Sequence, residues 1–239
     1  TQQNMSSHKK ILVIGDTHFP YSHPDCIDFL SKLNKYYKPD TVVHIGDEAD
    51  YHSQNFHGVD PDLPSAFDEL EVTKSWIKRL EKIFPKMTLL ESNHGSLVLR
   101  RAIASKMSRQ FIKPYNDILD VNKGWVWKDK HFIDTDKNRI MFAHQFSKDI
   151  AKAVKETSMC CVQGHFHTVS EVKFVATDYS LNWGISTGCL VNKDSLSMAY
   201  MKVNVAKPIL SCALITDGIP AITPMVLKKN GSWDKNIYI

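Results

Sequence analysis

The fold of this chain is decided by ILVIGDTH, residues 11–18. Four apolar residues stop at Gly15, as a buried strand of a parallel sheet does, and the polar residues Asp16 and His18 follow directly. The run TVVHI at residues 41–45 repeats this pattern and stops at Gly46. A helix predicted at Pro24–Tyr37 connects the two strands, so the chain begins as an α/β unit.

The same alternation predicts the rest of the fold. We expect a helix from Ser65 to Phe84, a strand at Met87–Leu90 and a helix from Leu97 to Met107. A β-rich second half follows, with a hairpin turn at Asp217-Gly218. We expect two packed sheets covered by helices, and a single domain over residues 1–239. Its second half should contain strands at 139–143, 159–162, 169–177, 196–203, 209–215 and 221–227 and a helix at 148–156.

The composition is that of a soluble globular protein, with 43% hydrophobic and 23% charged residues. The formal net charge of +4 is too small to indicate a nucleic-acid or membrane protein, but residues 1–72 hold five basic and twelve acidic residues. Five cysteines in no metal-site spacing suggest buried thiols in a reducing compartment. The start is polar and no apolar run approaches membrane-spanning length. We therefore expect a cytoplasmic protein with no membrane partner.

Polar side chains follow each predicted core strand at the point where it ends. Because the carboxyl ends of parallel strands meet at one edge of a sheet, these side chains should face a common ligand crevice. Any single one is more simply read as a structural residue, but five strands in succession carry the pattern. The residues are Asp16 and His18, Asp47 and Asp50, Asn93 and His94, His144, and His165 with His167.

The residue types at this edge favour divalent metal ions. Imidazole with carboxylate and amide oxygen, and no thiolate, suits Mn, Fe, Zn or Ni better than Ca or a structural zinc. There are enough ligands for two ions, and one carboxylate can bridge them. The pattern thus predicts a two-metal hydrolytic site.

Taken in order, these motifs resemble the calcineurin-like metallophosphoesterase superfamily. The resemblance implies a four-layer αββα sandwich of two mixed β-sheets, with a dinuclear metal centre at the strand ends. It also implies two divalent ions, Mn or Mg, with Fe, Zn, Ni or Co as other occupants. By this resemblance one ion takes Asp16, His18, Asp47 and His167, and the other takes Asp47, Asn93, His144 and His165.

The resemblance implies that a metal-activated hydroxide attacks phosphorus while His94 donates a proton to the leaving oxygen. Asn93, His94 and Arg100 are the expected substrate contacts. Two departures from the family pattern stand out. Gly95 follows His94 where the family usually has an acid, so Asp50 or Glu48 must orient His94, with neither favoured. Tyr51 replaces the arginine that protein Ser/Thr phosphatases carry after the second aspartate, which argues against that branch.

The compact chain and the Asn-His-Gly variant resemble small phage-type members of the superfamily, including a 5′-deoxynucleotidase. We therefore expect hydrolysis of nucleoside or deoxynucleoside 5′-monophosphates, in the host cytoplasm if the protein is viral. One alternative is a DNA phosphodiesterase or exonuclease, which would need a basic groove for several phosphates. Another is a catalytically weak scaffold subunit. A basic cluster after His94 is either a phosphate-steering surface or a solvated helix face. Its members are Arg100, Arg101, Lys106, Arg109 and Lys113.

Overall fold

The first sheet grows from the parallel strands that the repeated apolar runs predict. The computed structural model describes residues 9–56, 60–195 and 206–239. Its six-stranded sheet has the order β11-β10-β1-β2-β3-β4, in which β1 to β4 are parallel and β10 and β11 extend the β1 edge in antiparallel fashion. The strands are β1 (Lys10–Ile14), β2 (Thr41–His44), β3 (Met87–Leu90), β4 (Trp125–Lys128), β10 (Ser211–Thr216) and β11 (Ile219–Pro224).

A second, five-stranded sheet has the order β5-β6-β7-β9-β8. Its three central strands are parallel, and antiparallel strands form both edges. Both sheets are therefore mixed. The strands are β5 (His131–Asp134), β6 (Arg139–Phe142), β7 (Cys160–Gln163), β8 (Ser170–Ala176) and β9 (Leu181–Thr187).

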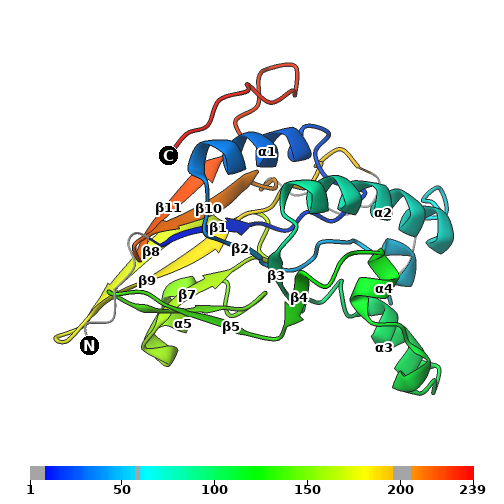
Figure 1. The fold of residues 1–239 in the computed structure, drawn as a ribbon, viewed down its shortest axis with the longest axis horizontal. Helices are drawn as coiled ribbons and strands as arrows, with labels where there is room; N and C mark the ends of the chain where they lie inside the picture. The colour runs from blue at the N-terminus through cyan, green and yellow to red at the C-terminus, as the bar shows by residue number, and fades with distance from the viewer. Residues whose placement is uncertain (1–8, 57–59, 196–205) are drawn as a thin grey trace.

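Four layers result, because each sheet buries both faces (Figure 1). Helices α1 (Cys26–Tyr37) and α2 (Ala66–Ile83) cover the first sheet, and α5 (Ile150–Thr157) covers the second. Alternate side chains of β1 show the principle: Leu12 and Ile14 pack against the helices, while residues 11 and 13 pack between the sheets. The predicted αββα sandwich is confirmed.

Several predicted boundaries differ from those in the structure. Helix α1 begins at Cys26 rather than Pro24, and α5 spans Ile150–Thr157 rather than 148–156, with Asp149 capping its N-terminus. The helix predicted to reach Met107 ends as α3 (Leu97–Ala104), because Lys106 adopts a left-handed conformation with φ of 58°. Short helical elements lie in two of the connecting segments: η1 (His52–Gln54) between β2 and α2, and η2 (Arg109–Phe111) with α4 (Tyr115–Leu119) between α3 and β4.

Strands β5 and β9 were not predicted. Strand β9 was missed because Gly184 lies in its interior. A Cβ atom there would lie 2.6 Å from Ile150 Cγ1, so the glycine allows α5 to pack closely on the sheet. The predicted hairpin is confirmed, with Asp217 and Gly218 both at positive φ. The strand predicted at 196–203 lies outside the described residues.

The predicted burial of the cysteines is confirmed. All five cysteines are free and buried, at positions 26, 160, 161, 189 and 212. Among the described residues, no helix has the length and apolar character needed to cross a membrane.

Candidate metal centre at the strand ends

The loops that leave β1, β2, β3, β6 and β7 converge on one edge of the sandwich. Asp16 and Asp47 are buried there, and the loops are joined by backbone bonds: the His18 N–H donates to the Asp47 carbonyl at 2.8 Å. The His165 N–H donates to Asp16 Oδ2 at 2.8 Å, which ties the β7 loop to the β1 loop. Residues from distant parts of the chain thus meet around two aspartates.

The first group consists of Asp16, His18, Asp47 and His167, whose ligand atoms all lie within 4.8 Å of one another. His167 Nε2 is 3.1 Å from Asp16 Oδ2, and His18 Nε2 is 3.4 Å from Asp47 Oδ2. The four side chains present oxygen and nitrogen atoms to a common point. This is the set that the family resemblance assigns to one ion, and its role as a ligand set stays a prediction.

The second group shares Asp47 with the first and adds His144 and His165. His144 Nε2 lies 3.3 Å from Asp47 Oδ2 and 2.7 Å from Asn93 Oδ1. His165 Nδ1 lies 3.1 Å from the same Asn93 oxygen. Asn93 thus joins this group through its amide oxygen, and all seven predicted ligands come together.

The chemistry of this cluster fits bound cations. Asp16 Oδ1 is buried and has no hydrogen-bond partner, while the Nε2 atoms of His18 and His167 face each other at 3.2 Å. Burial would lower the pKa of His144, but neighbouring Asp47 raises it to about 9. Burial would likewise lower the pKa of His18, yet Asp47 and Asp50 raise it well above its ordinary value. The carboxylates therefore favour positive charge here, which divalent ions would supply.

Neighbouring groups orient the imidazoles. His144 Nδ1 lies 3.0 Å from the Ile45 carbonyl oxygen and donates to it, and His18 Nδ1 donates to Asp50 at 2.6 Å. Each ring then presents Nε2 to the cluster, the arrangement seen around metal-ligating histidines. Gly164 leaves space for the Asp16 carboxylate, because a Cβ atom at position 164 would lie 2.1 Å from Asp16 Oδ1.

The structure distinguishes the two carboxylates considered as partners of His94. His94 Nδ1 lies 2.6 Å from the Asp50 carbonyl oxygen and 3.2 Å from Asp50 Oδ1. Glu48 is instead held by Trp127, whose indole N–H donates to it at 2.9 Å, and burial raises the pKa of Glu48 to about 7. Asp50 therefore orients His94, and the Nε2 atom of that ring remains for a substrate.

The unusual third motif has a local explanation. Ser92 Oγ accepts hydrogen bonds from the N–H of Asp47 at 2.9 Å and from that of Gly95 at 3.1 Å. A Cβ atom at position 95 would come within 2.9 Å of that hydroxyl oxygen. The serine and the glycine are thus coupled. Ser92 stands where the family motif, Gly-Asn-His followed by an acid, usually has its glycine, so both residues depart from that pattern.

Arg100 lies one turn into α3, where its Nη1 is 3.4 Å from the Asn93 carbonyl oxygen. A small hollow of about 240 Å³ opens here beside the cluster. Its polar lining places Arg100 next to His94, as expected for substrate contacts, although that role stays a prediction. The lining residues are Asn55, Phe56, Asn93, His94, Leu97 and Arg100.

Sequence comparison agrees with this geometry. A family model described as calcineurin-like phosphoesterase matches residues 9–168, which include all seven clustered residues. The chain belongs to the calcineurin-like phosphoesterase family. Members of this family are metallophosphoesterases, so the chain is a hydrolase-type protein with residues suited to divalent metals. No curated protein sequence matches it at a significant level.

Solved structures are similar to this chain at low sequence identity. One is Vps29 of Chaetomium thermophilum in complex with a cyclic peptide, at 13% identity and a TM-score of 0.52, covering 98% of this chain and 95% of that one. Another is an archaeal phosphodiesterase, at 16% identity and a TM-score of 0.49, covering 89% and 98%. A third is the phosphoesterase Yfce of E. coli, at 15% identity and a TM-score of 0.47, covering 94% and 96%.

Proposed function

We propose that this protein hydrolyses a phosphomonoester of a nucleotide at a site that holds two divalent metal ions. The supporting observation is the convergence of two acid and histidine groups on the shared carboxylate of Asp47. One ion would be held by Asp16, His18, Asp47 and His167, and the other by Asp47, Asn93, His144 and His165. When bound, such ions supply Lewis-acid charge and lower the pKa of water to provide a nucleophile. Mn or Mg is the proposed occupant.

His94 is the proposed general acid. Its Nδ1 is engaged by Asp50, and its side chain is 21% exposed, so Nε2 can reach a bound substrate. Hydrolysis adds the oxygen of water to phosphorus and breaks the bond between phosphorus and the ester oxygen. His94 Nε2 would donate the proton that this leaving oxygen needs, which lowers the barrier to its departure.

The hollow beside His94 supports a small substrate. Its volume of about 240 Å³ and its polar lining suit a phosphate and a sugar. The Arg100 guanidinium would pair with phosphate oxygens there, as arginine does at phosphate sites. We therefore propose nucleoside or deoxynucleoside 5′-monophosphates as substrates. The five buried thiols favour a reducing compartment such as the cytoplasm.

A second candidate reaction is the hydrolysis of a phosphodiester in nucleic acid. Residues 92–116 contain five basic residues and no acidic residue, and this segment starts at the site itself. A catalytically weak scaffold is less well supported. Burying this many converging carboxylates and imidazoles is unfavourable unless cations compensate them, and a scaffold has no use for those cations.

Phosphate release from a panel of substrates tests the proposal. Metal-stripped protein is supplied with Mn or Mg and assayed on deoxynucleoside monophosphates, on bis(4-nitrophenyl) phosphate and on DNA. We expect metal-dependent release from the monophosphates. Cleavage of DNA without turnover of monophosphates would favour the second candidate instead. No turnover of any substrate with several metals would favour the scaffold.

A further inference from the structure

Helix α3 and the segment after it form the most basic surface near the site. We call residues 97–113, which comprise α3, the turn after it, η2 and Lys113, the basic arm. Between Glu91 and Asp117 the chain has no acidic residue, so the five positive charges of the arm have no acidic residue beside them in sequence. In Figure 1 the arm lies beside α4 at the end of the molecule opposite the tip of the β8–β9 hairpin.

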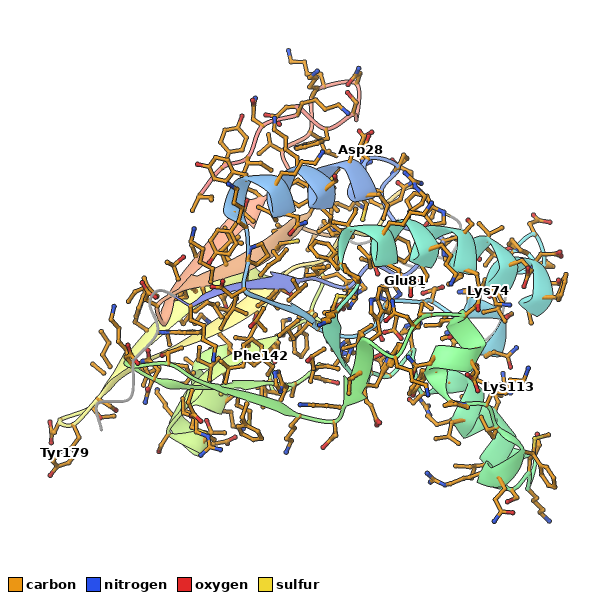
Figure 2. All side chains as sticks on the ribbon, in the orientation of Figure 1. Asp28, Lys74, Glu81, Lys113, Phe142 and Tyr179 are labelled. Carbon is orange, nitrogen blue, oxygen red and sulfur yellow. The ribbon has the colours of Figure 1, made fainter. Side chains whose placement is uncertain are left out.

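The positive charges of the arm are exposed and unpaired. Arg100, Lys106, Arg109 and Lys113 are exposed to solvent, and within the described residues none of them forms an ion pair with a carboxylate. Lysines on other elements behave differently: Lys74 pairs with a glutamate on α2, for example. Figure 2 shows Lys113 at the side of the molecule far from Tyr179, beside α3 and α4. The arm thus presents a local excess of positive charge.

One arginine of the cluster has a structural role instead. Arg101 is half-buried and donates from Nε to the Gln54 carbonyl at 2.8 Å and from Nη2 to the Asn55 carbonyl. Its guanidinium also lies 4.3 Å from the ring centre of Phe56. It therefore attaches the arm to the loop after β2, and the ligand-facing charges are those of the other four residues.

The arm also exposes apolar side chains between its charges. Every residue from Ile103 to Phe111 is exposed, and Phe111 is 78% exposed, with Arg109 and Lys113 two residues to either side. Met107 is 49% exposed. Aromatic rings between basic residues are typical of surfaces that bind single-stranded nucleic acid, because unpaired bases stack on them while phosphates pair with the cations.

Two hollows lie where the arm begins, between the candidate metal centre and the rest of α3. The first contains His94 and Arg100, as described above. The second, of about 300 Å³, is lined by Gly95 and Ser96 together with Arg109 and Lys113, and Glu91 is the one acidic residue in its lining. Basic residues therefore line both hollows, and the first of these lies beside the proposed general acid.

We infer that the basic arm binds single-stranded nucleic acid whose backbone extends away from the strand-end site. A polynucleotide fits both regions, since it carries a phosphate ester for the site and further phosphates and bases for the arm. An acidic peptide would match the charge but has neither phosphate nor bases. The inference rests on the second candidate of the proposed function and deepens it, because it assigns the residues that would hold the polynucleotide outside the site.

Anisotropy of a fluorescent dT20 oligonucleotide tests this inference on the full chain in EDTA, where no cleavage occurs. The triple variant Lys106→Glu/Arg109→Glu/Lys113→Glu should weaken binding by at least about 30-fold. It should also reduce the slope of log K against log salt by about 2, since each phosphate contact contributes about 0.7 for single strands. The matched control is Lys148→Glu/Lys152→Glu/Lys155→Glu, which makes the same charge change around exposed positions of α5. It should bind dT20 to within about threefold of the unmodified protein.

A second variant separates base stacking from charge. Phe111→Ala should lower the affinity for dT20 about tenfold, because stacking on one ring is lost, and should leave the affinity for inorganic polyphosphate unchanged. Equal losses in the two triple variants would overturn the inference, and so would binding of poly-glutamate as tightly as dT20. Turnover of a mononucleotide by the arm variant should be unchanged. If the proposed function is wrong, the unmodified protein will not hydrolyse the mononucleotide. Its binding of dT20 in EDTA is a separate measurement that does not depend on that result.

Discussion

The strand-end site and the basic arm are neighbours in sequence and opposites in physical character. His94 closes the third motif, and α3 begins three residues later. In the site, charged side chains are buried and face one another. In the arm, the charged side chains other than Arg101 are exposed and face solvent. The chain changes from one environment to the other within a single helical turn.

This difference explains how each region uses charge. In the site, Asp47 is buried and its pKa is held well below the ordinary value: burial opposes this, and His144 and His18 prevail. Such a cluster is specific because each group depends on its neighbours. In the arm, cations keep their hydration and act at longer range, which attracts polyanions but is screened by salt. The following predictions separate these two modes.

The largest effect should come from Asp47→Asn, because this carboxylate belongs to both groups. We expect kcat to fall by about 10³-fold or more, since metal-ion catalysis contributes several kcal/mol and each 1.4 kcal/mol is tenfold. Bound metal, measured by mass spectrometry, should fall as well. Asp136→Asn, at an exposed position of the β5–β6 turn, is the control and should retain full activity. Activity above a tenth of normal in Asp47→Asn would show that this residue does not bridge two ions.

His94→Ala should lower turnover of nucleoside monophosphates by about 10²- to 10⁴-fold, the usual contribution of a general acid. Metal content should persist, because His94 is not among the proposed ligands. 4-Nitrophenyl phosphate should lose less activity, since its leaving group needs no proton. His131→Ala on β5 serves as the histidine control. Loss of metal together with activity in His94→Ala would mean that the residue is a ligand.

The metal-free protein should lose stability as pH rises. Burial would lower the pKa of His144, but Asp47 raises it to about 9 in the folded state, above the unfolded value of about 6.5. The stabilisation is therefore complete below pH 6.5 and is lost as pH passes 9. Urea unfolding should show a decrease of up to about 3 kcal/mol across this window. Added Mn should remove the dependence, and a flat profile without metal would contradict the coupling to Asp47.

Asp50→Asn should reduce activity by about 10- to 100-fold, the usual effect of removing a group that orients a ligand. Asp50 contacts both His18 and His94, so the loss should appear in metal affinity and in kcat. Glu48→Gln is a close control, because Glu48 contacts Trp127 instead. It should retain activity to within a few-fold. Equal losses in both variants would indicate general damage to the loop after β2.

The smallest effect should come from Arg100→Ala, at the boundary between the two regions. Loss of an exposed charge-assisted contact to phosphate should raise KM about tenfold and leave kcat nearly unchanged. Arg101→Ala should instead lower the free energy of unfolding by about 1 kcal/mol, because it removes hydrogen bonds to the Gln54 and Asn55 carbonyls. A raised KM in Arg101→Ala together with a lower free energy of unfolding in Arg100→Ala would show that the roles assigned to these two arginines are wrong.

Much of the fold and the gathering of seven polar residues at the strand ends could be predicted from local patterns, while the roles of those residues stay predictions. The apolar runs at 11–14 and 41–45 predict parallel strands, and the polar residues directly after them are confirmed to meet at one edge. The unpredicted strand β9 carries an interior glycine. Its lack of a side chain allows close contact with α5, which is distant in sequence. Helix α3 ends before Met107 because Lys106 adopts a left-handed conformation, and the periodic apolar residues 103 and 107 are exposed.

Periodicity predicted two packed sheets covered by helices, and the position of polar residues directly after the strands predicted that they cluster, because both properties follow from strand and helix geometry along the chain. The family was indicated by the resemblance of the motifs taken in order. The choice of Asp50 over Glu48, the coupling of Ser92 to Gly95 and the distinction between Arg100 and Arg101 were decided only by the tertiary structure. Each depends on distances between side chains on separate loops. Such distances are set by how the layers pack, and sequence spacing carries no record of them.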